Sequence, residues 1–153
     1  MKSAIPAATL LPHPAPISPY ARLLLYGIRR MAAGGIDDAH AAHAFFTGFG
    51  LGYRRPLILT RAFMAEVSRV SAIRLVVAPC CCPRTSEAEN VLLNAVAGAV
   101  AHPQETHDAL ARLLHVRECL GLVTSAQAVA ASFADQGMPL NDDCNFCKGD
   151  EAF

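Results

Sequence analysis

Three consecutive cysteines lie between two prolines at residues 79–83. Because proline disfavours helix on both sides, we expect an extended segment there, with Cys80 and Cys82 on the same side of the chain. Two thiols on one side could bind one soft metal ion or exchange disulfides with a partner. In the C-terminal tail, Cys144 and Cys147 have the CxxC spacing with which two thiolates hold one tetrahedral ion. The four thiols could therefore form a zinc site.

The thiol pattern leaves three interpretations open. The cysteines at 80–82 could fill space as small buried hydrophobic side chains, with the tail thiols incidental. They could bind metal, although a typical zinc signature has two CxxC pairs and here a vicinal run replaces one of them. They could also take part in thiol redox chemistry. A thioredoxin-like function for Cys144 and Cys147 is not favoured, because no βαβ pattern surrounds them.

A glycine-rich segment at 48–52 leads into the predicted start of a helix. Arg54 and Arg55 follow it, at the helix end where the dipole disfavours cations, and this placement predicts a bound anion. Gly50, Gly52 and the two arginines are the residues expected to contact that anion. The segment has neither the preceding strand of a Rossmann fingerprint nor the Gly-Lys-Ser/Thr ending of a P-loop. The alternative is a turn between helices with two solvated arginines.

Two histidines and nearby carboxylates suggest a second metal hypothesis. Residues three apart on a helix are neighbours, so His40 and His43 could share an ion with Asp37, and Glu66 could face them from the next helix. The favoured interpretation is simpler. The aspartates cap a helix, the histidines lie at its boundary, and Glu66 forms an ion pair with a nearby arginine. The candidate partners of Glu66 are Arg22, Arg29 and Arg30.

The composition indicates a folded protein without a membrane span. Hydrophobic residues make up 53% of the chain and charged residues 17%, and the mean hydropathy is +0.30. This is too apolar for a disordered chain, and it favours an oligomer interface. No apolar stretch reaches the roughly 18 residues of a membrane helix, and the N-terminus lacks the features of a signal peptide. We therefore expect a cytoplasmic protein with reduced cysteines.

The charges are separated along the chain although the net charge is zero. Residues 1–84 carry ten basic and three acidic side chains, and residues 85–153 carry three basic and ten acidic ones. Two halves that neutralise each other, within one chain or between subunits, would explain this pattern. A basic face for an anionic ligand is the alternative. A nucleic-acid partner is not favoured, because the residues around 39–56 fit a helix-turn-helix poorly.

The elements that must position these residues are predicted to be about six helices around one core, an all-α single domain. A short extended segment at 73–82 interrupts them, either as a strand or as a straight connector. We expect a flexible proline-rich leader at 1–17, a helical domain at 18–140 and an acidic, cysteine-containing tail at 141–153. Helix starts are indicated at Ser18-Pro19, Asp37 or Asp38, Pro56, Ser86, Pro103 and Thr124.

Two segments resemble an uncharacterised family of small bacterial helical proteins, of the domain-of-unknown-function type. They are residues 30–40, RMAAGGIDDAH, and residues 79–84, PCCCPR. The resemblance covers roughly residues 18–140, so Cys144 and Cys147 fall outside it, and this weakens the four-thiolate site. The family implies no activity. The residues themselves favour a non-enzymatic helical module that self-associates or binds a protein partner, with thiolate metal-binding or redox sensing, and anion binding, as alternatives.

Overall fold

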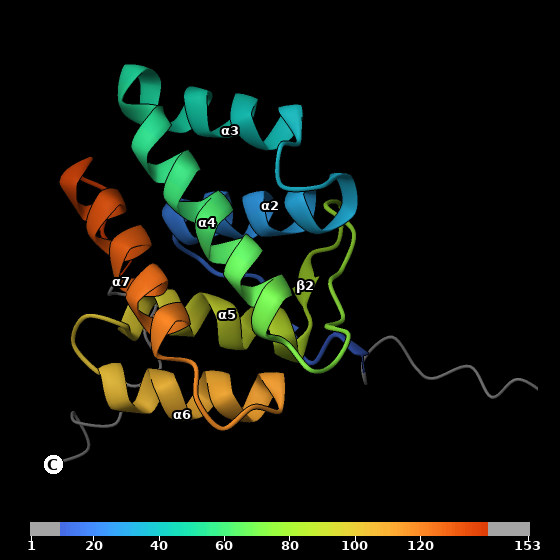
Figure 1. Ribbon diagram of the computed structural model, residues 1–153. Helices are drawn as coiled ribbons and strands as arrows, with labels where there is room; N and C mark the ends of the chain where they lie inside the picture. Colours follow the sequence, from blue (N-terminus) through green and yellow to red (C-terminus); the bar gives the residue numbers. More distant parts are fainter. Residues whose placement is uncertain (1–9, 141–153) are drawn as a thin grey trace, which may run out of the picture.

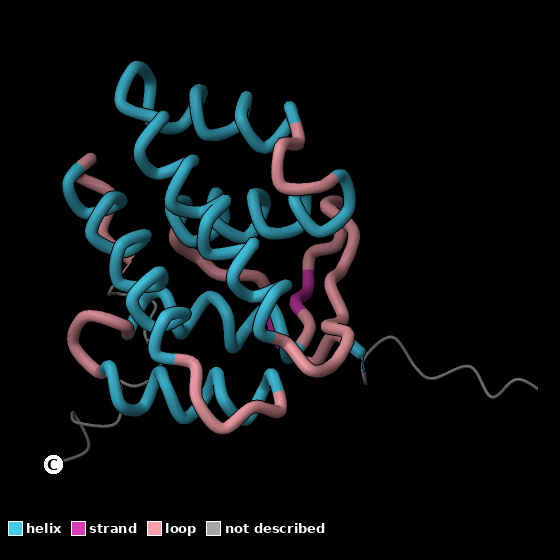
Figure 2. The backbone as a smooth tube through the Cα atoms, viewed as in Figure 1, coloured by secondary structure: helices cyan, strands magenta, loops and turns pink. Residues whose placement is uncertain are grey.

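The computed structural model describes residues 10–140, and the fold is mostly helical, as the sequence predicts (Figure 1; Figure 2). Two short strands, β1 (His13–Pro14) and β2 (Arg84–Thr85), form one antiparallel pair. No helix within residues 10–140 combines the length and the apolar character that a membrane span requires. The helices are α2 (Pro19–Gly34), α3 (Ala39–Phe49), the 3-10 helix η1 (Gly50–Tyr53), α4 (Arg54–Val70), α5 (Glu87–Gly98), α6 (Pro103–Leu114) and α7 (Leu120–Asp135).

The helices surround one core, and three pairs of them pack together most extensively. Helix α4 lies alongside α7, α5 alongside α6, and α2 alongside α3 (Figure 1). Phe45 of α3, Phe63 of α4 and Phe133 of α7 are fully buried members of this core. The Phe133 ring meets Phe45 and Phe49 edge-on, with ring centroids 6.1 and 4.9 Å apart. Burial of these large apolar faces is the main force that holds the helices together.

Local capping fixes where three of the helices begin, as predicted. The Ser18 hydroxyl accepts hydrogen bonds from the first turn of α2, and Pro19 occupies a position that needs no N–H donor. The Asp38 carboxylate accepts from the Ala41 N–H at the start of α3. Ser86 and Glu89 form a complete capping box at the start of α5.

Two predicted helix starts are wrong. Helix α4 begins at Arg54 rather than at Pro56. Proline is tolerated at this third position because the N–H that it lacks would have no helical partner in the first turn. Helix α7 begins after Cys119, so Thr124 lies inside the helix and its hydroxyl donates to the Leu120 carbonyl. The side chain of Gln127 donates to Ala99 O instead of capping.

The segment 73–82 is a connector and a turn, with no strand in it. Its backbone finds side-chain partners instead of a strand: the Ala78 N–H donates to Glu89, and the Ser86 hydroxyl donates to Val76 O. The Cys82 N–H then donates to Pro79 O at 3.0 Å, which closes a tight turn. The sheet instead joins β2 to β1 and so places part of the predicted leader against the helical domain.

Candidate functional site

The cysteine turn is exposed to solvent. Cys80 and Cys81 are exposed free thiols at its corner, and Cys82 is half-buried. The interpretation that these cysteines are small buried hydrophobic side chains is therefore wrong for Cys80 and Cys81. Cys119 behaves in the opposite way, because it is buried at the start of α7 and its burial, followed by the nearby negative charges, raises the pKa of its thiol. Only the thiols of the turn are presented to a reactant in solution among the described cysteines.

A buried arginine fastens the turn to α2. Arg29 is only 4% exposed. Its Nη1 donates to Cys82 O and its Nη2 to Arg84 O, both at 2.8 Å. In Figure 1 the connector between α4 and β2 accordingly runs along the end of α2. The backbone on both sides of Pro83 is thus held by one guanidinium, whose planar fork suits several acceptors at once.

Glu89 balances the buried charge of Arg29. Its carboxylate is fully buried and accepts from Arg29 Nε and Nη2 at 2.8 and 3.1 Å. The N–H groups of Ala78 and Ser86 donate to the same carboxylate, each at 2.9 Å. Each carboxylate oxygen therefore accepts two hydrogen bonds, and the carboxylate accepts four in total. Such a paired and fully hydrogen-bonded carboxylate can remain charged inside a core.

A second arginine, Arg30, interacts mainly with Asp38 and only weakly with Cys80. Hydrogen bonds and charge interactions with Asp38 and, to a smaller extent, with Cys80 raise the pKa of Arg30. Arg30 also contacts both oxygens of Asp38, at 3.1 and 2.8 Å, and this contact together with the Ala41 N–H lowers the pKa of Asp38 to about 2. The charge of Arg30 is therefore paired with that of Asp38.

A small cavity of about 200 Å³ adjoins the turn. Its wall includes Arg22, Tyr26 and Arg29 from one face of α2, together with Cys80 and Cys82. Positions 22, 26 and 29 share that face because they are spaced by four and three residues. The turn therefore presents its thiols beside a basic, partly enclosed surface.

Sequence reasoning missed the pair Arg29–Glu89. It expected Glu66 to pair with an arginine of α2, but Glu66 binds Arg69 three residues later, at 2.9 and 2.6 Å. Glu89 also completes the capping box with Ser86, and this local role gives no sign of a distant partner. Its position among the buried residues Ala88 and Leu92 of α5 was the available signal that its charge would need a buried partner.

Neither of the metal sites suggested by the sequence is formed within residues 10–140. No group of three or more His, Cys, Asp or Glu side chains is close enough there to hold an ion. His40 and His43 are exposed, and the His40 ring contacts Arg30 at 3.1 Å. Cys144 and Cys147 lie outside the described residues, so the four-thiolate zinc site with Cys80 and Cys82 stays a prediction.

The glycine-rich segment forms a close contact with the end of α7. Gly50 ends α3 with a φ of +63°, a conformation that favours glycine. The backbone at Gly52 lies close to the end of the Gln136 side chain, which would have to move if Gly52 carried a Cβ. Arg55 forms an ion pair with Asp135 at 2.6 Å, while Arg54 is exposed. Any anion bound by Gly50, Gly52, Arg54 and Arg55 would compete with Asp135 for Arg55.

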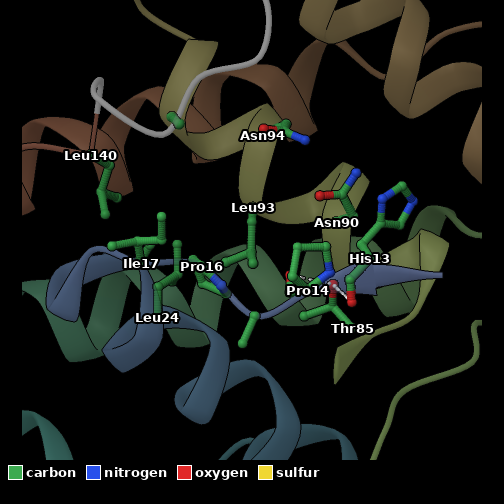
Figure 3. Close-up of a pocket in the computed structure, with 13 residues that line it drawn as sticks. His13, Pro14, Pro16, Ile17, Leu24, Thr85, Asn90, Leu93, Asn94 and Leu140 are labelled. Atoms are coloured by element: carbon green, nitrogen blue, oxygen red, sulfur yellow. Dashed lines mark hydrogen bonds between the residues drawn. The ribbon is translucent and has the colours of Figure 1, made fainter. Parts of the chain in front are cut away.

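A further cavity lies between β1, α2 and α5 (Figure 3). Its volume is about 250 Å³, its floor is apolar at Leu24 and Leu93, and its rim carries His13 and Asn90. His13 Nε2 lies 2.5 Å from the Glu87 carboxylate. This volume is at or below the lower end of typical ligand pockets, about 300 Å³. Its polar wall residues are His13, which contacts Glu87, and the uncharged Thr85, Asn90 and Asn94.

Comparison with protein-family models matches residues 3–134 to a family of unknown function (DUF6628). The match contains the cysteine turn, both members of the Arg29–Glu89 pair and most of the predicted leader, and it leaves Cys144 and Cys147 outside. Searches among curated proteins and among solved structures found no match.

Proposed function

We propose that the chain, which belongs to the DUF6628 family of unknown function, is a thiol–disulfide exchange protein that responds to oxidation through Cys80. One observation carries the proposal: two exposed vicinal thiols lie on a turn that is fastened by a buried ion pair, and Cys80 lines the same cavity as the side chain of Arg22. Reactive cysteines occupy partly exposed, electropositive surroundings of this kind. A reducing compartment such as the cytoplasm would keep these thiols free until a disulfide reaches them.

The exchange needs only a small disulfide as the oxidant. The Cys80 thiolate attacks one sulfur of that disulfide, a new S–S bond forms, and the other half leaves as a thiolate. A second thiol of the turn, Cys81 or Cys82, then loses its proton to solvent and attacks the Cys80 sulfur, which releases the remaining half. The turn has then lost two electrons and the small disulfide has become two thiols.

The prediction is that Cys80 reacts faster than its neighbour. With the full-length reduced protein at pH 7 and a limiting amount of oxidised glutathione, we expect Cys80 to form the mixed disulfide about three to ten times faster than Cys81. Both thiols are exposed on one turn, so Cys81 is an internal control for access, and buried Cys119 should react slowest. Quenching with isotope-coded alkylating reagents and peptide mass spectrometry gives each rate separately. Equal rates at Cys80 and Cys81 would contradict the proposal.

The helical module that binds a protein remains a second candidate, and an apolar groove favours it. The groove has a volume of about 530 Å³ and lies between α2, α4 and the connector at 71–77. Met31, Met64 and Leu75 contribute to its wall, and Ile36 on its wall is 39% exposed. Flexible methionine side chains suit an apolar surface that accepts another chain. We propose a second copy of this protein as the occupant, since the composition favours self-association.

A charged residue at the rim of the groove should weaken this self-association. We expect Ile36→Glu to raise the dimer dissociation constant about tenfold or more, because the carboxylate would be desolvated at the interface. Val100→Glu, at a position that is 63% exposed outside the groove, is the matched control and should have no effect. Light scattering coupled to size exclusion, over a concentration series, measures both. A wild-type protein that stays monomeric at high concentration would rule out this candidate.

A further inference from the structure

We infer that the disulfide that reacts at Cys80 carries carboxylate groups, and that Arg22 recognises them. This inference rests on the proposed exchange reaction at Cys80. It concerns the cavity of about 200 Å³ beside the turn, which can hold a carboxylate-bearing arm of a small disulfide while the sulfur atoms meet the thiol. A whole protein partner would need a much larger contact area.

The arginines around the turn differ in what they already bind. Arg29 is neutralised by Glu89 and Arg30 by Asp38. Arg22 and Arg84 have no carboxylate partner within residues 10–140, and their side chains donate only to backbone carbonyls. This face therefore carries more positive charge than the carboxylates paired with its arginines can neutralise. An incoming anion would be attracted to it.

Arg22 is placed to bind that anion. It lines the cavity from the first part of α2, its side chain is exposed, and its Nε donates to Pro16 O at 2.7 Å. That bond leaves the two terminal nitrogens of the guanidinium for a ligand, and this edge of the guanidinium matches the two oxygens of a carboxylate. Tyr26, one turn further along the same face, also lines the cavity. The charge of the site thus favours an anionic disulfide over a neutral one.

The test compares oxidised glutathione with its tetraethyl ester, which has the same disulfide but no carboxylates. The rate at Cys80 with each reagent is divided by the rate of N-acetylcysteine amide with that reagent, in 0.15 M salt to limit long-range attraction. We expect this corrected rate to be about fivefold higher for the acid than for the ester. Arg22→Gln should reduce the preference towards one, and Arg22→Lys should keep part of it, because lysine retains the charge without the planar fork.

Arg112→Gln is the matched control, since it removes the same charge from an exposed position on α6. It should keep the full preference. If Cys80 reacts rapidly with both reagents without preference, or if the preference survives in Arg22→Gln, the inference about carboxylates is wrong and the exchange function stands. If Cys80 reacts no faster than Cys81 with either reagent, the proposed function itself fails. Circular dichroism of each variant verifies that the helices are intact.

Discussion

Replacing Glu89 with Gln is expected to lower the free energy of unfolding by about 3–5 kcal/mol. The substitution conserves shape, but the four groups around the carboxylate, two from Arg29 and the N–H groups of Ala78 and Ser86, are all donors. A glutamine amide has only one acceptor oxygen, so its NH2 group must face two donors whichever way it is turned. The substitution also leaves the Arg29 charge buried and unpaired. Urea unfolding followed by circular dichroism measures the loss.

Glu105→Gln is the control for Glu89→Gln. Glu105 lies in the first turn of α6 and is exposed, so its loss should cost only a few tenths of a kcal/mol from the helix dipole. A double variant, Arg29→Met with Glu89→Leu, should recover part of the stability, because it removes the unpaired charge as well. Equal effects of Glu89→Gln and Glu105→Gln would contradict the buried ion pair between Arg29 and Glu89, through which the cysteine turn is held.

Phe133→Ala is expected to destabilise the protein by about 3–5 kcal/mol. Phe133 is fully buried on α7 and meets Phe45 and Phe49 edge-on. Removing its ring leaves a cavity where three helices converge, and the surrounding side chains can fill it only in part. The lost edge-to-face contacts add to the lost burial. The free energy of unfolding from urea titration reports the effect.

Phe46→Ala makes the same change at an exposed position. Phe46 is 46% exposed on α3 and meets Tyr53 edge-on, so we expect a cost of about 1 kcal/mol or less. The difference between the two variants isolates burial from the loss of an aromatic ring as such. Similar costs at Phe133 and Phe46 would mean that α7 does not pack into the core through Phe133.

The sequence alone predicted those features that depend on residues near one another in the chain. Helical spacing of apolar residues and the caps at Ser18, Asp38 and Ser86 predicted most of the helices and the all-α fold, because a helix and its cap are made within one or two turns. The same local reasoning failed at Thr124. There a start signal lies inside α7, because burial of Leu122 and Val123 extends the helix beyond it.

Only the tertiary structure decided which cysteines are exposed and which charges are paired. Local sequence could not reveal that Arg29 meets Glu89, since sixty residues separate them and their contact depends on how α2 packs against α5. The short β1–β2 pair and the cavity beside Arg22 likewise join the leader or α2 to a loop far along the chain. The sequence therefore supplied the thiols and the arginines, and long-range packing supplied their arrangement, because burial and ion pairing depend on every element that surrounds a side chain.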